Sequence, residues 1–290
     1  MMMHLAGVLY AIGCGIVFAG VGIAGKIMSP EVPALLKVFM RFFVGGLVLA
    51  AFVSWKELRQ LSKKRLAHLA FMGFIAVILF NVLFFSSLSY ISVMTSSLIM
   101  SAQPIVTLFI TSLIARHIPS LKIQLSFLLA FIGVALVITH GQVGWDVLTG
   151  NVGEFLMIIA LLCQVGYVLL LRSISTHVSS THISFVVAVS GILFLIPLMF
   201  GTNSFSSIMS FTATDWWCAA YLGAGGGTLG LVLFNLGIVR LGAAQGSLVI
   251  FSTLSLVTLL WSVLVGHAVT SWEAMGTVFV LVGLIIGLKK

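Results

Sequence analysis

The chain has 290 residues, of which 61% are hydrophobic and only 7% are charged. Soluble proteins carry about a quarter charged residues, so this composition excludes a soluble globular fold. A net charge of +8 would suit a nucleic-acid-binding surface only if Lys and Arg were gathered on one face, but they are scattered between apolar stretches. The composition indicates an integral membrane protein that contacts the lipid bilayer and binds no nucleic acid.

Ten apolar stretches follow one another, separated by charged, Pro-containing or Ser/Thr/Asn-rich breaks. Each is almost continuously apolar over about 20 residues, as a membrane-spanning helix requires, whereas barrel strands alternate over about 10 residues. The predicted spans are residues 5–28, 34–54, 67–88, 93–115, 121–140, 152–172, 180–200, 215–238, 243–265 and 270–288. We therefore predict an all-α integral membrane protein with ten transmembrane helices.

The distribution of charge predicts the orientation of these helices. The segment WKELRQLSKKR, residues 55–65, is the most basic connection, and such connections lie in the cytoplasm. An even number of spans then places both termini in the cytoplasm, in a multi-pass protein of the cell inner (plasma) membrane. This orientation puts most Lys and Arg inside, and it puts these acids outside: Glu31, Asp146, Glu154, Asp215 and Glu273.

The two halves of the chain repeat each other. An offset of 150 positions aligns several identical residues without a gap, namely Ser97 with Ser247, Ser112 with Ser262, His117 with His267 and Gly133 with Gly283. We predict a first repeat over residues 1–140, an external connection over 141–150 and a second repeat over 151–290. Because five helices is an odd number, the second repeat enters the membrane from the opposite side, and the repeats are inverted, as in many transporters.

Four motifs carry a family resemblance: FAGVGIAGK (Phe18–Lys26), ALLKVFMR (Ala34–Arg41), GEFLMIIALLCQVGYVLLLR (Gly153–Arg172) and VLFNLGIVRLGAAQGSL (Val232–Leu248). In order and spacing the chain resembles the EamA-type branch of the drug/metabolite transporter superfamily, with two tandem EamA domains. The resemblance implies a carrier, commonly an exporter, of small metabolites such as amino acids, nucleotide precursors or other amphiphilic or zwitterionic compounds. It implies neither an enzyme activity nor a cofactor.

The chain departs from the family pattern at two places. His117 and His267 stand where the family often has Glu, which removes a carboxylate from those helix ends. Phe18 replaces a frequent Trp, which keeps an aromatic surface but removes the indole donor.

Arg41 is the sharpest functional candidate. It lies about eight residues beyond Pro33, hence roughly 12 Å into the predicted second helix. A charge at mid-bilayer costs at least about 2.5 to 3.5 kcal/mol on insertion scales. Arg41 therefore either binds carbonyls of a neighbouring helix or Glu31, or it contacts an anionic or zwitterionic substrate. Lys26, at a predicted helix end, is either an interfacial anchor or a functional group.

Amide and aromatic side chains form a second set of candidates. Amides within spans must face inward, where they either join helices or contact substrate. Gln103 precedes Pro104, which breaks helical hydrogen bonding near the midplane. Phe18 and Tyr167 lie on corresponding helices and either pack or line a site. We predict a mostly apolar central cavity lined by helices 1, 2, 3, 4, 6, 8 and 9, with these substrate-binding candidates: Arg41, Gln103, Tyr167, Asn235, Asn81, Gln164, Phe18 and Lys26.

Other functional classes fit the sequence less well. No Asp or Glu is predicted at mid-membrane, so the sequence offers no carboxylate there for proton transfer. A facilitator or exchanger therefore fits the sequence at least as well as a proton-coupled carrier. No His/Cys cluster has metal-ligand spacing, and we predict no metal site and no catalytic residue. The alternative is an integral-membrane enzyme acting on lipid-linked substrates, which would need converging acids, metal ligands or a nucleophile. A channel is a third alternative. Substrate identity, transport direction, coupling ion and oligomeric state are not specified.

Overall fold

A computed structural model describes residues 2–116, 118, 120–139, 152–175, 177–202, 204–265 and 270–288. The predicted external connection over residues 141–150, with Asp146, lies outside these ranges, as do His117 and His267. Within the described ranges the chain forms helices and their connections, with no strand.

Each predicted span coincides with a helix or with a continuous run of helices. In the first half these are α1 (Met2–Ile27), α2 (Ala34–Ala50), the short α3 (Trp55–Arg59), α4 (Lys63–Gly73) continued by the π-helical η1 (Phe74–Val82) and α5 (Leu83–Ser87), α6 (Val93–Met100), α7 (Gln103–Ile114) and α8 (Leu121–Thr139). In the second half they are α10 (Val152–Ile174), α11 (Ser180–Gly201), the 3-10 helix η2 (Ser204–Ser210), α12 (Ala213–Ala220) continued by the π-helical η3 (Tyr221–Gly230) and α13 (Leu231–Leu241), α14 (Ala243–Leu264) and α15 (Ser271–Leu288).

Eight of these helices or runs, among the described residues, are long and apolar enough to cross a membrane. The two predicted spans outside this group are those of α2, which has 17 residues, and of α15, whose apolar part is Ser271–Gly283. The multi-pass helical fold is confirmed, whereas ten crossings stay a prediction.

Helix starts coincide with the polar breaks of the sequence. Ser62, Ser92, Ser179 and Thr212 each accept a hydrogen bond from the backbone N–H three residues further on, at the starts of α4, α6, α11 and α12. Such N-caps satisfy backbone donors that have no partner within the helix. The breaks therefore end one helix and begin the next.

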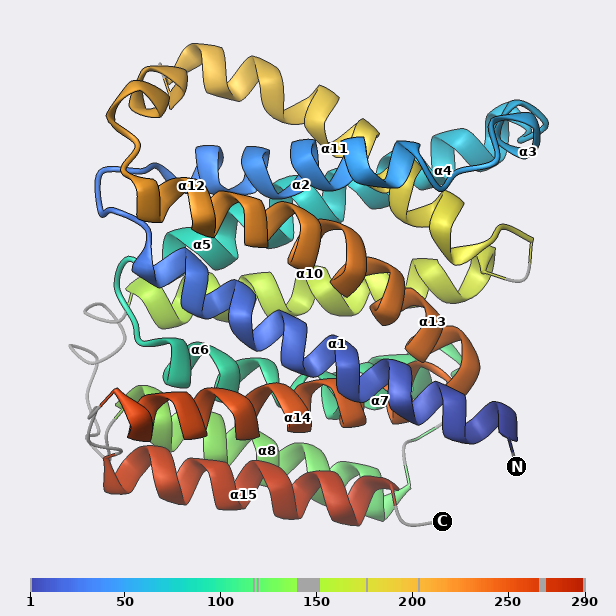
Figure 1. Cartoon of the computed structure of the whole chain (residues 1–290). Coiled ribbons are helices and arrows are strands. Elements are labelled where there is room, and N and C mark those ends of the chain that lie inside the picture. The colour runs from blue at the N-terminus through green and yellow to red at the C-terminus, as the bar shows by residue number, and fades with distance from the viewer. Residues whose placement is uncertain are drawn as a thin grey trace.

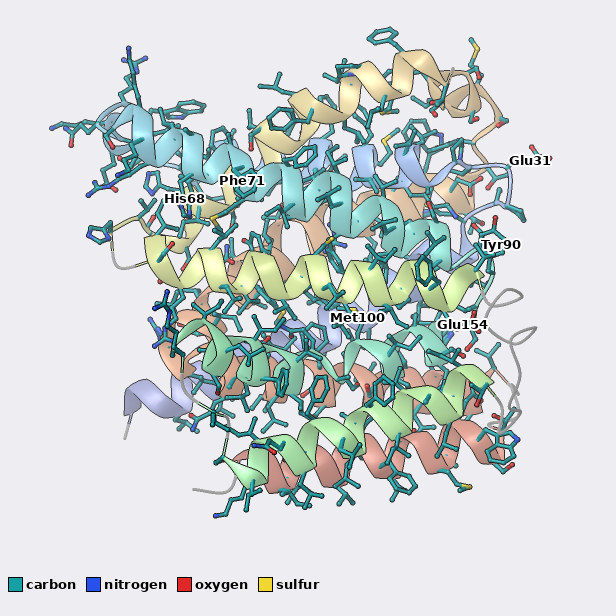
Figure 2. All side chains as sticks on the ribbon, turned by 180° about the vertical axis from the view of Figure 1, so that it is seen from behind. Glu31, His68, Phe71, Tyr90, Met100 and Glu154 are labelled. Carbon is teal, nitrogen blue, oxygen red and sulfur yellow. The ribbon has the colours of Figure 1, made fainter. Side chains whose placement is uncertain are left out.

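The helices run side by side and their ends gather at two opposite ends of the molecule (Figure 1). We call the end with α3 and the start of α1 the basic end, since it carries residues 55–65, and the end with α12 and the start of α15 the acidic end, since it carries Asp215 and Glu273. Figure 2 shows Glu31 and Glu154 together at the acidic end, far from His68. Most charges of the described residues are thus sorted between the two ends, with Lys26 at the acidic end, Glu57 at the basic end and Arg41 in the interior among the exceptions.

Glycines let α2 and η3 pack backbone against backbone. A Cβ atom added to Gly227 would lie 2.0 Å from the carbonyl oxygen of Arg41, and one added to Gly45 would lie 2.8 Å from the carbonyl carbon of Gly227. Only glycine permits an approach this close. The packing brings Arg41 of α2 against the backbone of η3.

Candidate functional site

Arg41 is buried where α2, η1 and η3 meet. Its Nη1 donates to Oδ1 of Asn81 over 2.8 Å, and its Nη2 donates to the carbonyl of Gly226 over 3.3 Å. The guanidinium carbon lies 5.3 Å from the ring centroid of Phe18 and 5.4 Å from that of Phe42, within cation–π range. Its Nε has no hydrogen-bond partner among the described residues. Two guanidinium nitrogens are therefore bound to the protein, and the third, Nε, has no partner.

The π-helical η1 fixes the orientation of Asn81. The amide nitrogen of Asn81 donates to the carbonyl of Ala76, five residues earlier, over 2.6 Å. This bond leaves the amide oxygen turned toward Arg41. The π-segment thus aligns an acceptor with the buried cation, in keeping with the frequent occurrence of such segments at functional sites.

A small cavity adjoins the guanidinium. Its volume is about 30 Å³, enough for about two water molecules. Gln164 of α10 is its polar member besides Arg41, and its amide makes no hydrogen bond within the part of the chain that the structure describes. The lining consists of Phe18, Val21, Arg41, Phe80, Phe84, Met100, Gln164, Phe251 and Leu254. We call these residues and Asn81 the central site.

A second polar cluster lies beside the central site. The hydroxyl of Tyr167 donates to Oδ1 of Asn235 over 3.0 Å, and the amide nitrogen of Asn235 donates to Oγ of Ser184 over 2.9 Å. Phe234 links this cluster to the central site, since its ring centroid lies 6.1 Å from that of Tyr167 and 5.9 Å from that of Phe18. The polar groups of Tyr167 and Asn235 thus satisfy each other and do not line the cavity.

The other two candidates lie elsewhere. Nε2 of Gln103 donates to Oγ1 of Thr107 over 3.1 Å, and its buried Oε1 has no partner among the described residues. Nζ of Lys26 donates to the carbonyls of Leu88 and Ile91, over 2.6 and 3.1 Å, at the acidic end. The structure therefore brings together Arg41, Asn81, Phe18 and Gln164, but neither Gln103 nor Lys26 lines the central cavity.

The family to which these helices belong follows from a comparison with known sequences. The model of the EamA-like transporter family matches residues 5–139 and matches again over residues 151–288. The chain belongs to the EamA-like transporter family. The two matches make it a tandem EamA protein of the drug/metabolite transporter superfamily, which confirms the resemblance of its motifs.

Curated relatives of this EamA protein include three uncharacterized transporters of Bacillus subtilis (strain 168). YyaM is 28% identical over 82% of this chain and 78% of its own length, and YetK is 26% identical over 76% and 68%. YrdR is 28% identical over 74% and 69%. Family and relatives support a membrane transporter and point away from an enzyme, and the family implies a small-molecule substrate.

A solved crystal structure shares the fold of this EamA protein. Its TM-score is 0.59 at 16% identity, and the match covers 97% of both chains. At this identity the likeness shows the fold alone. Within the described residues, no group of three or more His, Cys, Asp or Glu side chains is placed to hold a metal ion.

Sequence reasoning missed the aromatic walls of the central site of this EamA protein. Phe80, Phe84 and Phe251 line the cavity, but the chain has 22 Phe and their type alone carried no signal. A usable signal was their spacing, since Phe80 and Phe84 lie one helical turn apart beside Asn81. The carbonyl of Gly226 could not have been found, because it depends on the packing of η3 against α2.

Proposed function

We propose that this protein carries a small amphiphilic metabolite with a carboxylate, an amino acid or a similar compound, across the cytoplasmic membrane by alternating access. The observation that carries the proposal is the buried guanidinium of Arg41, with its unpaired Nε, beside an aromatic cavity. The direction we propose is export, as the family resemblance implies.

The missing counter-charge of Arg41 supports an anionic or zwitterionic substrate. Among the described residues, the carboxylate within ion-pair distance of a basic side chain is that of Glu57, 3.8 Å from Nε2 of His182, and no carboxylate lies at such a distance from Arg41. Glu31, which the sequence offered as a partner, is exposed, and Arg41 binds Asn81 and Gly226 instead. A buried cation without an anion is costly, so a substrate carboxylate would gain a charge-assisted hydrogen bond there.

The cavity walls support an apolar body on that substrate. Four aromatic residues line the cavity beside the guanidinium, namely Phe18, Phe80, Phe84 and Phe251. A volume of about 30 Å³ is far below the 300 Å³ or more of typical ligand pockets, so the helices must move apart to admit a metabolite. The described conformation is the contracted one.

Three features support inverted repeats. The helices α1 and α10, which begin the two EamA matches, run in opposite directions (Figure 1). Both π-segments carry a side chain that donates to the carbonyl five residues earlier, Asn81 to Ala76 and Thr228 to Gly223.

The third feature is the contact between α8 and α15. A Cβ atom on Gly133 would lie 2.7 Å from the carbonyl oxygen of Gly276, and one on Gly283 would lie 2.9 Å from that of Ser126. The offset of 150 positions that aligns Gly133 with Gly283 also aligns Ser126 with Gly276. The alignment thus maps the contact of Gly133 with Gly276 onto the contact of Gly283 with Ser126. A two-fold relation between the two halves requires such a pair of equivalent contacts. Alternating access is a natural use of that relation.

A ligand screen on the purified protein tests the substrate class. Amino acids and other amphiphilic carboxylates are compared with their own primary amides, which keep the body of the molecule and remove the charge. A ligand at a hundredfold its Kd stabilises the folded protein by about 2.7 kcal/mol, and this is read as a rise in Tm. We expect some carboxylates to raise Tm and to exchange across proteoliposome membranes. Equal shifts from acids and amides would overturn the role given to Arg41.

A further inference from the structure

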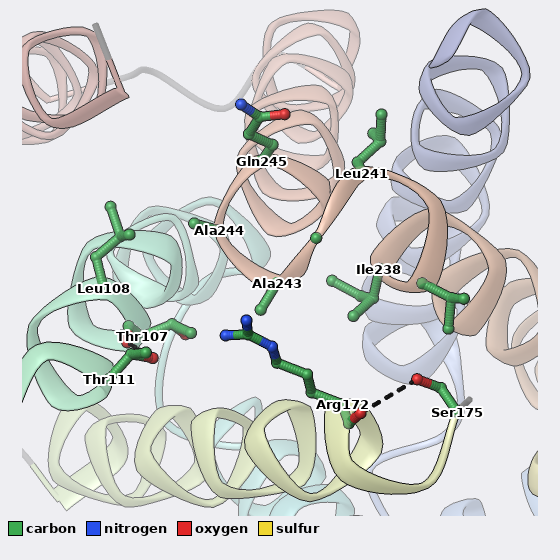
Figure 3. Close-up of a pocket in the computed structure, with 12 residues that line it drawn as sticks. Thr107, Leu108, Thr111, Arg172, Ser175, Ile238, Leu241, Ala243, Ala244 and Gln245 are labelled. Atoms are coloured by element: carbon green, nitrogen blue, oxygen red, sulfur yellow. Dashed lines mark hydrogen bonds between the residues drawn. The ribbon is translucent and has the colours of Figure 1, made fainter. Parts of the chain in front are cut away.

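A second and larger cavity opens at the basic end. Its volume is about 500 Å³, and it lies between α7, the end of α10 and the connection from α13 to α14. Figure 3 shows the guanidinium of Arg172 pointing into it, between Thr111 of α7 and Ala243 at the start of α14. Ser175 donates to the carbonyl of Arg172, but the guanidinium itself makes no hydrogen bond or ion pair to any residue that the structure describes.

The residue of the first repeat that corresponds to Arg172 in the second repeat is Lys26. Aligning the two family matches from their first residues, 5 and 151, sets Lys26 against Arg172 and Gly20 against Gly166. For the later helices, the offset of 150 positions sets Leu88 against Ile238 and Ile91 against Leu241. Lys26 donates to the carbonyls of Leu88 and Ile91, while Ile238 and Leu241 line the cavity into which Arg172 points.

Further contacts hold the acidic end shut. The backbone N–H and the hydroxyl of Ser29, just beyond α1, both donate to Asp215 of α12 over 2.8 Å. The hydroxyl of Thr95 in α6 donates to Glu273 of α15 over 3.1 Å. Three places on this end are therefore joined by hydrogen bonds.

Within the part of the chain that the structure describes, the basic end lacks the corresponding contacts. Ser175 and Gln245, the counterparts of Ser29 and Thr95, line the open cavity. The counterpart of Asp215 is Arg65. Arg65 is the third residue of α4 after the N-cap Ser62, as Asp215 is the third residue of α12 after Thr212. The same position thus carries a carboxylate at the closed end and a cation at the open end.

We propose that Lys26 and Arg172 are paired gate residues, each closing one end of the transporter by donating to carbonyls of its own repeat. In the described state Lys26 holds the acidic end shut and Arg172 is disengaged. In the opposite state Arg172 donates to the carbonyls of Ile238 and Leu241, and Lys26 releases those of Leu88 and Ile91. A carbonyl oxygen has two lone pairs, so a carbonyl already bonded within a helix can accept the guanidinium as well. The proposal rests on the alternating access proposed above.

The connection at the open end allows this movement. Gly242, between α13 and α14, has φ +86°, a conformation that residues with a Cβ rarely adopt. Its counterpart Ser92 is a regular N-cap that binds Thr95. The end that the structure shows open therefore has the more adaptable connection.

Cysteine reporters at two corresponding positions test the gates. Met94, buried at the acidic end, and Ala244, which lines the open cavity, are changed one at a time, Met94→Cys or Ala244→Cys, after Cys14, Cys163 and Cys218 have been replaced by Ala. The protein is placed in lipid nanodiscs without substrate, so that a polar maleimide reaches both ends, and labelling rates are measured.

Removing each gate residue shifts the population of states in opposite directions. Lys26→Met should raise labelling at position 94 about tenfold, because the closed acidic end loses charge-assisted hydrogen bonds. Arg172→Met should lower labelling at position 94 about tenfold, because the state with the basic end closed loses its contacts. The matched control is Arg59→Met, since Arg59 is an exposed cation of α3 at the same end, and it should change neither rate.

Equal labelling in the Arg172 and Arg59 variants would make Arg172 an interfacial anchor and overturn the proposal. So would an unchanged rate at position 94 in the Lys26 variant. If either Met variant fails to fold, Arg172→Lys and Lys26→Arg replace it, and these should give smaller shifts in the same directions. Because labelling needs no substrate, it measures the opening of the two ends even if the protein transports none of the tested metabolites. Normal transport together with unchanged labelling rates in the Lys26 and Arg172 variants would overturn the gate proposal and leave the proposed transport function standing.

Discussion

Arg41 is the residue to which we assign both a structural role and, in the proposed function, the binding of substrate. Two of its nitrogens bind Asn81 and Gly226, which hold the guanidinium in place, and the third is unpaired beside the cavity. A side chain serving packing alone would be expected to have all its buried donors satisfied. The unpaired Nε is therefore the atom we assign to the substrate.

Arg41→Gln should abolish recognition of the carboxylate while leaving the fold intact. Gln keeps a hydrogen-bond donor but deletes the charge, and a hydrogen bond to a charged group contributes about 1.5 to 3 kcal/mol, equivalent to roughly 10-fold to 100-fold in affinity. Ligand titrations by thermal shift and proteoliposome exchange measure the loss. Arg59→Gln, on the exposed α3, is the control. A variant that binds carboxylates normally would make Arg41 a purely structural residue.

Tyr167→Phe tests the second cluster. The change leaves the buried Oδ1 of Asn235 without its donor. An unsatisfied buried acceptor costs about 1 to 3 kcal/mol in soluble proteins, whereas a side-chain hydrogen bond between membrane helices contributes about 0.6 kcal/mol on average, so we expect a loss near 1 kcal/mol. Thermal unfolding in detergent measures it, and Tyr90→Phe is the control because Tyr90 is 67% exposed. If transport falls far more than stability, Tyr167 contacts substrate in another state of the cycle.

At the residue scale, unusual polarity in the sequence indicated several side chains that the structure places close together, whereas their binding of substrate stays a prediction. Arg41, Asn81 and Gln164 stand out because polar groups are expensive in hydrocarbon, and the structure brings them to one cavity. Lys26 stands out equally, yet it binds carbonyls at a helix end, because its stem allows it to reach polar groups at the acidic end. Sequence shows which groups need partners, but packing decides which partners they find.

At the scale of elements, the glycine-rich η3 determines how closely two helices approach. Gly227→Ala would place a methyl group 2.0 Å from the carbonyl oxygen of Arg41 and force α2 away from η3. Overpacking of this kind costs about 1 to 3 kcal/mol, so we expect a lower Tm and reduced transport, because Arg41 is displaced with α2. Gly166→Ala is the control, since nothing lies within 4 Å of its added methyl group. Equal Tm values for the two variants would show that α2 and η3 are less tightly packed than described.

The sequence predicted the helices well but not their internal geometry. Apolar stretches and polar breaks locate helix ends, and the Gln103–Pro104 step correctly predicted a break, since α6 ends at Met100 and α7 begins at Gln103. The π-segments η1 and η3 were not predicted, because one extra residue in a turn leaves the hydropathy of a fully apolar run unchanged. Their detection requires the backbone.

At the scale of the whole molecule, the offset of 150 positions predicted a repeat that the two family matches confirm as tandem EamA domains. The sequence could not predict which end is closed. That difference depends on Asp215 and Glu273, which the charge pattern identified only as acids of one side, and whose bonds to Ser29 and Thr95 join separate helices. In the transport cycle proposed above, two related halves thus hold one end shut and leave the other open.

The orientation in the membrane is the remaining prediction at this scale. The basic end carries residues 55–65 and the described cations Arg116, Lys122, Arg172 and Arg240, whereas the acidic end carries Glu31, Glu154, Asp215 and Glu273. Short connections rich in Lys and Arg stay in the cytoplasm, so the basic end and both termini should lie there, with residues 201–214 outside.

Two exposed positions at opposite ends report this orientation. In the cysteine-free background, Arg59→Cys on α3 and Met209→Cys in η2, where the side chain is 96% exposed, are expressed separately in intact cells. A membrane-impermeant maleimide should label position 209 at once and position 59 only after the membrane is permeabilised, because charged reagents do not cross hydrocarbon. Labelling of both positions from outside would indicate two orientations in one membrane. Labelling of position 59 alone would show that the orientation is the reverse of the predicted one. The open cavity would then face the outside of the cell, which contradicts the proposed export cycle.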